Sequence, residues 1–223
     1  MNKSIITIAV IVLSVVSLPV YAKGKPANPG GGKPDKDNSG PVVESVCIDP
    51  GHGGTQPGTI SPNGEIEESD LNLEVALELE RLLDDNGYTV ALTRDTDVTL
   101  SNNDRYTFCN EQTDATTLIS IHHNGSTNQS VDYSLGLYHN GSNRELAAVV
   151  TDAVASEFDN PNAGTDRFPS GVLIKSDMPS MMSEGYFLTN TDRQAELTTD
   201  RDGMVLREAQ ALYDGIATYY AAR

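Results

Sequence analysis

The sequence predicts a single α/β domain in which helices cover both faces of a mostly parallel, twisted sheet. Two observations carry this prediction. Short apolar segments rich in β-branched residues alternate with longer amphipathic segments, and glycine, asparagine or proline separates most of them. Strands that alternate with helices form parallel sheets, because each helix returns the chain to the edge where the last strand began. Residues 42–223 have the length of one domain and contain no internal repeat.

The first elements of this domain are the clearest. Residues 42–48 are apolar and β-branched, which predicts a buried strand. Leucines that recur among acidic residues predict an amphipathic helix over residues 71–83, with Ser69 as its N-cap and Asn86-Gly87 as its stop. By the same criteria we expect strands at 88–92, 117–122 and 135–138, extended segments at 172–174 and 181–187, and helices that open with capping boxes at 101–104 and 142–145 and close the chain at 204–220.

The N-terminal residues predict export. Residues 1–22 contain one early charge, Lys3, an apolar run over 5–16 and a small-residue ending at Ala22, which is the pattern of a signal peptide. Because the apolar run is shorter than the ~20 residues of a spanning helix, we expect cleavage rather than insertion in the membrane. Residues 23–41 are mostly glycine, proline, lysine, aspartate and asparagine, which predicts a flexible linker. We therefore expect a periplasmic or extracellular protein.

Charge and cysteine content narrow the function classes. The formal net charge is -17, so the surface repels nucleic acid and other polyanions, and a substrate must be recognised by a shaped pocket. We expect a monomer that binds no nucleic acid. Two cysteines, Cys47 and Cys109, permit one disulfide in an exported chain, although two buried free thiols are an equal alternative.

Histidines lie at the ends of two predicted strands. His52 stands within the run Asp-Pro-Gly-His-Gly-Gly at 49–54, at the carboxyl end of the first strand, where open α/β sheets bind their ligands. The strand at 117–122 ends in two adjacent histidines, His122 and His123. Side chains alternate along a strand, so His122 and Asn124 share one face while His123 takes the other. One of these two histidines can therefore join His52, and Asn124 could orient a ligand or contact a substrate.

Two imidazoles and one carboxylate with an open fourth position are the usual ligand set of a catalytic zinc. Glu65, Glu67 and Glu68 all lie in the loop after His52, and their chemistry leaves the choice among them open. A zinc hydrolase also needs a base that accepts a proton from water. Glu184 is the candidate, because it interrupts an otherwise uncharged segment at 178–190, where desolvation should raise its pKa. Taken singly, each of these residues also fits a purely structural role.

Together, these motifs resemble the zinc-dependent N-acetylmuramoyl-L-alanine amidases of the amidase type 3 family. Residues 49–54 resemble the opening motif of the family, whose histidine is the first zinc ligand. Residues 68–73 resemble its next motif, which selects Glu68 over the two other acids as the second ligand. Residues 120–124 resemble Ser-Ile-His-Ala-Asn, so His122 is the third ligand and His123 replaces the usual alanine. Further matches to the family pattern lie at Thr93, Arg94, Asp97 and Arg105.

The last motif concerns catalysis. Residues 184–190 resemble Glu-x-Gly-Phe-Leu-Ser-Asn with a slightly altered order, which makes Glu184 the catalytic residue. The resemblance implies that 42–223 is an amidase catalytic domain that uses Zn²⁺ to hydrolyse the amide between N-acetylmuramic acid and L-alanine in peptidoglycan. Two alternatives are a zinc peptidase that cuts within the stem peptide and a non-catalytic wall-binding protein. Residues 125–134 are too few for the regulatory helix that some family members carry, so we expect activity without an activator.

Overall fold

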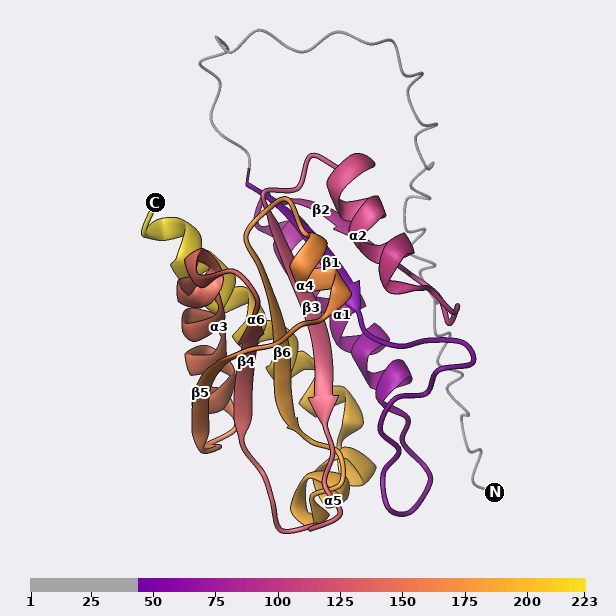
Figure 1. The fold of residues 1–223 in the computed structure, drawn as a ribbon. Helices are drawn as coiled ribbons and strands as arrows, with labels where there is room; N and C mark the ends of the chain where they lie inside the picture. The colour runs from indigo at the N-terminus through magenta and orange to yellow at the C-terminus, as the bar shows by residue number, and fades with distance from the viewer. Residues whose placement is uncertain (1–43) are drawn as a thin grey trace, which may run out of the picture. The chain divides into compact units, whose positions relative to one another are not determined.

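The computed structural model describes residues 44–223, and the expected signal peptide, the linker and Val42 and Val43 lie outside this range. A six-stranded sheet forms the centre of the domain (Figure 1). No helix among the described residues is long and apolar enough to cross a membrane. The elements in chain order are β1 (Ser45–Pro50), α1 (Glu68–Asp85), β2 (Thr89–Leu92), α2 (Asn102–Glu111), β3 (Thr117–Asn124), β4 (Ser134–Tyr138), the short 3-10 helix η1 (Gly141–Asn143), α3 (Arg144–Glu157), β5 (Asn162–Arg167), α4 (Gly171–Lys175), β6 (Ser180–Phe187), α5 (Thr191–Thr199) and α6 (Arg201–Ala221).

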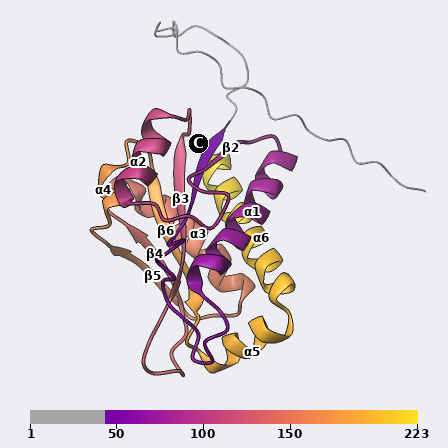
Figure 2. The same cartoon turned by 90° about the vertical axis from the view of Figure 1, so that its right-hand side faces the viewer.

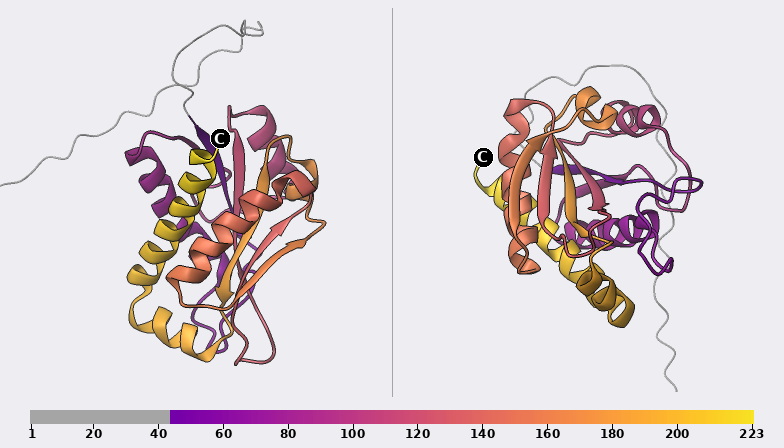
Figure 3. Two further views of the ribbon diagram at one scale, coloured as in Figure 1. Left: turned by 90° about the vertical axis from the view of Figure 1, so that its left-hand side faces the viewer. Right: turned by 60° about the horizontal axis from the view of Figure 1, so that its bottom comes forward.

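The sheet is mostly parallel, as the sequence predicts. Its strand order is β2-β1-β3-β6-β4-β5, and the pairing of β4 with β6 is antiparallel while the other pairings are parallel. Helices α1, α3 and α6 pack on one face, and α2 and α4 lie together on the other (Figures 2 and 3). The carboxyl ends of β1 and β3 are adjacent, so the loops that follow them meet at one edge of the sheet.

Side-chain alternation divides the core into two parts. Val46 and Ile48 of β1 join the large cluster against α1, α3 and α6, whereas Cys47 joins a small cluster with α2 and α4. The same alternation in β3 sends Ile119 and Ile121 to the large cluster and Leu118 to the small one. Residues at even positions of β3 therefore face α2 and α4, and those at odd positions face α6.

Three local predictions are wrong in instructive ways. Helix α1 begins at Glu68, so Ser69 lies in its first turn and is not the N-cap. The amide groups of Glu68 and Ser69 instead donate to the carbonyls of Thr59 and Pro57, so the preceding loop takes the place of a capping side chain. Helix α3 likewise begins after η1, without a cap from Ser142.

The third error concerns residues 172–174, which form part of helix α4 rather than an extended segment. Their β-branched composition favours a strand, but Val172 packs against the Cys47 cluster and Leu173 against Met182, and this packing overrides the intrinsic preference. We predicted neither β5 nor α5, although Asn190 signals the start of α5: its side chain accepts from the amides of Asp192 and Arg193 as the N-cap. Strand β5 is polar and exposed along most of its length, so it lacks the apolar alternation by which strands are recognised.

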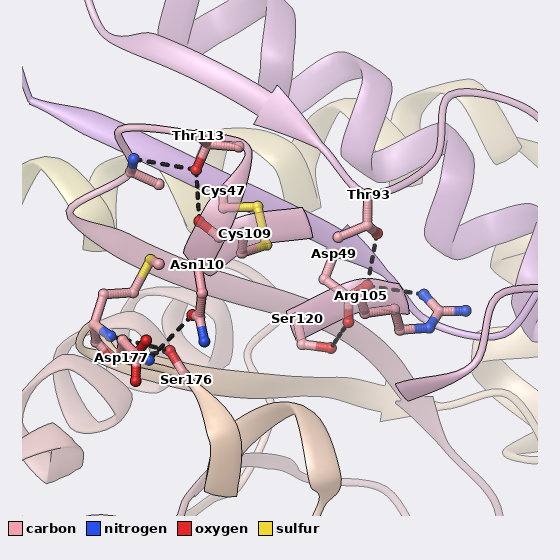
Figure 4. The surroundings of a disulfide bond; sticks show 12 residues. Cys47, Asp49, Thr93, Arg105, Cys109, Asn110, Thr113, Ser120, Ser176 and Asp177 are labelled. Carbon is pink, nitrogen blue, oxygen red and sulfur yellow. Dashed lines mark hydrogen bonds and ion pairs between the residues drawn. A yellow bond between two sulfur atoms is a disulfide. The ribbon is translucent and has the colours of Figure 1, made fainter. Parts of the chain in front are cut away.

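A disulfide joins β1 to α2. Cys47 and Cys109 are bonded, with Cα atoms 5.9 Å apart, and both residues are fully buried (Figure 4). The structure thus decides between the bridge and the two free thiols that the sequence left open. Because the bond closes a loop between residues separated by 62 positions, it restricts the unfolded chain substantially.

We expect reduction of this disulfide to lower the free energy of unfolding by about 2–4 kcal/mol, because the unfolded chain regains the entropy of the opened loop. Urea unfolding with and without a thiol reductant measures the effect. In the double variant Cys47→Ala/Cys109→Ala, the reductant should have no effect. Equal stability of the wild-type protein in its oxidised and verified reduced forms would contradict the expectation.

Candidate metal and catalytic site

His52 follows β1 in an uncommon backbone conformation. Its φ is 60°, a left-handed value that non-glycine residues seldom adopt and that other contacts must hold in place. The Arg105 guanidinium on α2 donates to the carbonyls of Pro50 and His52, at 2.7 Å each. These bonds fix the backbone on both sides of Gly51 and so set the direction of the His52 side chain.

A second buried arginine joins this loop to α1. Arg94 donates to the carbonyls of Pro50 at 3.0 Å and Gly51 at 2.9 Å, and also to that of Ser69 at 2.7 Å. Because Ser69 belongs to the first turn of α1, one guanidinium holds the end of β1 and the start of α1 in fixed relation. Glu68 therefore enters the site from a helix start that is tied to the same loop as His52.

Asp49 compensates the charge of Arg105. Its buried carboxylate accepts hydrogen bonds from Arg105 at 2.8 Å, Thr93 at 2.6 Å and Ser120 at 2.8 Å (Figure 4). Burial alone would raise the pKa of Asp49, but the charge of Arg105 and these hydrogen bonds outweigh it, and the pKa lies below its usual range. Asp49 is thus ionised at neutral pH and connects β1 to β3 and α2.

Three ligand-type atoms converge at the edge of the sheet. Glu68 Oε1 lies 2.9 Å from His122 Nδ1 and 3.2 Å from His52 Nε2, and all three side chains offer a ligand atom within 4.8 Å of the others. The two imidazole rings meet edge to face, with centroids 4.8 Å apart. Among the described residues, this is the one cluster of at least three histidine, cysteine or acidic side chains with the spacing of a metal site.

The protonation of this cluster favours a metal. Burial would raise the pKa of Glu68, but hydrogen bonds with His122 and His52 hold it well below its usual range, so the carboxylate is ionised. Burial disfavours the charged form of His122, yet the bond to Glu68 and its charge raise the pKa of this histidine. An ionised carboxylate between two imidazoles is a site that favours a cation.

The residues present fit zinc. Zn–N and Zn–O distances of about 2.0–2.1 Å in a tetrahedron imply ligand atoms about 3.3 Å apart. Glu68 Oε1 lies at similar distances from the two histidine nitrogens, 2.9 Å and 3.2 Å. The surrounding backbone is shaped to the ligands. A Cβ atom on Gly51 would lie 2.3 Å from the His122 ring, and one on Gly58, whose φ is +71°, would lie 2.5 Å from Glu68 Oε2. Only glycine allows the loop to approach the three side chains so closely.

Glu184 lies beside the cluster, opposite His122 in the parallel pairing of β3 with β6. Burial raises its pKa, which suits a group that must accept and return a proton near neutral pH. Glu184, His52 and His122 line one cavity of about 330 Å³. The cavity is further lined by Asp49, Gln56, Leu100, Asn102, Arg105, Phe168, Ser170, Val172 and Met182.

The structure separates the other candidates from this cavity. Glu65 and Glu67 are exposed and do not line it. Glu68 does not line the cavity either, but it is buried and contacts both histidines. Asn124 accepts a hydrogen bond from the amide of Gly125 and is also absent from the lining, because the pairing shifts register after His122. Sequence reasoning missed Phe168, a solitary aromatic side chain in a polar segment that stands 43% exposed at the wall of the cavity.

Comparisons with known proteins agree with the geometry. A family model described as N-acetylmuramoyl-L-alanine amidase matches residues 46–218, most of the chain. The chain belongs to this amidase family. The resemblance expected from the motifs and the fold of the family are thus confirmed, and the family is one of hydrolases.

Relatives within the family cover the described domain. N-acetylmuramoyl-L-alanine amidase LytC of Bacillus subtilis is 30% identical over 81% of this chain, which spans 36% of the length of that relative. The catalytic domain of the amidase CwlV from Bacillus (Paenibacillus) polymyxa superposes with a TM-score of 0.75 at 27% identity, over 81% of this chain and 100% of its own. An N-acetylmuramoyl-L-alanine amidase from Clostridium difficile superposes with a TM-score of 0.75 at 28% identity, over 81% of this chain and 98% of its own.

We expect Asp49→Asn to lower the free energy of unfolding by about 3 kcal/mol, because it leaves Arg105 buried without a counter-charge. The matched change Asp85→Asn, which breaks an exposed pair with Arg81, should cost under about 1 kcal/mol. Urea unfolding at pH 7 measures both.

The pH dependence of the Asp49 contribution has a defined sign. Since folding lowers the pKa of Asp49, its contribution is complete above the ordinary carboxyl pKa of about 4 and is lost as the pH falls further. The stability difference between the wild-type protein and Asp49→Asn should therefore shrink below about pH 4. A difference that stays constant down to acid unfolding would refute the ion pair as its source.

Proposed function

We propose that this domain hydrolyses the amide bond between N-acetylmuramic acid and the L-alanine of peptidoglycan stem peptides, as a zinc-dependent monomer. Membership in the amidase family supports peptidoglycan as the substrate. The observation that carries the mechanism is the convergence of His52, Glu68 and His122 beside a cavity that His52, His122 and Glu184 line. A metal-dependent hydrolase needs residues that hold the ion and a base near it, and a carboxylate of raised pKa beside the triad meets the second need.

Each residue has a defined task in this proposal. His52, Glu68 and His122 would hold the ion through Nε2, Oε1 and Nδ1, the atoms that converge. Zinc, when bound, supplies Lewis-acid chemistry, since it lowers the pKa of a coordinated water and polarises a carbonyl oxygen. Glu184 accepts the proton of the attacking water on its carboxylate and returns it to the nitrogen of the leaving L-alanine.

We further propose that the enzyme is exported and needs no activating partner. The disulfide between Cys47 and Cys109 supports an oxidising compartment, in agreement with the signal-peptide pattern of residues 1–22. The connection from β3 to β4 leaves nine residues, 125–133, without a helix. The absence of a helix from this segment supports a site that no regulatory helix covers.

Digestion of purified peptidoglycan tests the reaction. The protein alone should release stem peptides that begin with a free L-alanine, as identified by mass spectrometry, and a chelator should abolish this release. Glu184→Gln should lower kcat by about 10²- to 10⁴-fold while the zinc content stays unchanged, whereas the exposed Glu65→Gln should keep full activity. Cuts within the stem peptide would indicate a zinc peptidase instead, and binding to the wall without any product would indicate a non-catalytic protein.

Zinc binding tests the ligand set independently of turnover. Glu68→Gln should lose most of its zinc, because an amide oxygen is a much poorer ligand than a carboxylate. The neighbouring Glu67→Gln is the matched control, and it should bind one zinc per chain like the wild-type protein, since Glu67 is exposed. Elemental analysis after dialysis measures the stoichiometry. Full zinc occupancy in Glu68→Gln would remove Glu68 from the ligand set.

A further inference from the structure

A buried polar network lies on the opposite face of β3 from the cavity. His123 Nδ1 is 2.8 Å from Asn72 Oδ1 on α1, and His123 Nε2 is 2.9 Å from Glu208 Oε2 on α6. The side chains of His123 and Glu208 are wholly inaccessible to solvent, and the aromatic ring of Tyr186 packs against His123. The proposed reaction uses none of these groups, so their presence in the core needs another explanation.

The network ends on the proposed metal ligand. The side-chain nitrogen Nδ2 of Asn72 lies 3.2 Å from the carbonyl oxygen of Gly51 and 3.4 Å from Glu68 Oε1. The backbone amide of His123 donates to the same Glu68 oxygen, at 3.1 Å. Hydrogen bonds therefore run from Glu208 in the core, through His123 and Asn72, to the carboxylate oxygen that faces His52 and His122.

The proton positions in this network follow from its acceptors. Gly51 O and the ionised Glu68 Oε1 can only accept hydrogen bonds, so Asn72 must direct its NH₂ group toward them and its Oδ1 toward His123. An amide oxygen only accepts, so His123 must carry a proton on Nδ1. The 2.9 Å hydrogen bond between His123 Nε2 and Glu208 Oε2 contains a second proton, which either the imidazole or the carboxyl group donates.

The network is costly to the fold. A histidine and a glutamate are removed from water, and Glu208 Oε1 and Tyr186 Oη have no hydrogen-bond partner among the described residues. Apolar side chains of similar volume commonly replace such buried pairs without loss of stability. Stability alone therefore gives no reason for the pair, whereas the contacts with Glu68 do.

We propose that His123 and Glu208 are positioning residues for the metal site: they fix the orientation of Asn72, and Asn72 holds the Glu68 carboxylate in the direction that zinc requires. This inference rests on the proposed function, because it takes Glu68 as a ligand. Hydrogen bonds behind a metal ligand restrict its rotation and commonly change metal affinity by 10- to 100-fold when they are lost. Neither residue touches the substrate or the ion.

The double variant His123→Phe/Glu208→Leu tests the proposal. It replaces the pair by apolar groups of similar volume and leaves no buried charge, but the buried Asn72 Oδ1 loses its donor, so the thermal stability of the variant without zinc should fall only slightly. Its zinc dissociation constant, measured by competition with a chromogenic chelator, should nevertheless rise about 10- to 100-fold. A purely structural role of the pair predicts that affinity and stability change together.

Two further variants locate the effect. Asn72→Ala should weaken zinc binding by a similar factor, and its addition to the double variant should cause little further loss, because the three residues act in series. Thr151→Val, which removes a buried hydrogen bond within α3 far along the chain from these groups, should leave zinc affinity unchanged whatever its effect on stability.

Nuclear magnetic resonance gives a readout that does not involve zinc affinity. Proton–nitrogen correlation spectra of the zinc-loaded wild-type protein should show His123 protonated at Nδ1. The proposal is overturned if Nδ1 of His123 lacks a proton, or if the double variant binds zinc as tightly as the wild-type protein. A wild-type protein that binds no zinc would refute the proposed function itself, and the two failures are therefore distinguishable.

Discussion

The ion pair between Asp49 and Arg105 is the interaction on which the rest of the site depends. It is almost wholly buried, and the guanidinium that it neutralises also holds the carbonyls on either side of Gly51. Without the counter-charge, burial of Arg105 would be unfavourable, and its restraint on the left-handed conformation of His52 would weaken. The geometry of the first metal-ligand candidate is thus set by a charge pair that makes no contact with its side chain.

The disulfide and this ion pair act on the same two elements. Cys47 and Asp49 are two residues apart on β1, and Arg105 and Cys109 are four residues apart on α2. A spacing of two on a strand and of four on a helix directs both side chains to one face. The covalent bond and the ion pair therefore attach α2 to β1 at two successive points, which keeps Arg105 in place (Figure 4).

Strand β3 contributes to the site from both of its faces. His122 points toward the cavity beside Glu184, while His123 enters the core toward α6, and its backbone amide bonds to Glu68. Adjacent residues of one strand thus place one candidate ligand, His122, and contact another, Glu68, from behind. Precise metal sites need such support, because a carboxylate that rotates freely spends part of its time in directions that bind poorly.

The sequence by itself determined the α/β class, most elements and the candidate residues, because periodicity, turn residues and motif chemistry are local properties of the chain. It could not choose among Glu65, Glu67 and Glu68 without a family resemblance, and it misjudged the segment 172–174 and overlooked β5. Only the tertiary structure decided these points. Burial, the pairing of Cys47 with Cys109 and the approach of Glu208 to His123 depend on residues far apart in the chain, and their distances are set by packing rather than by local propensity.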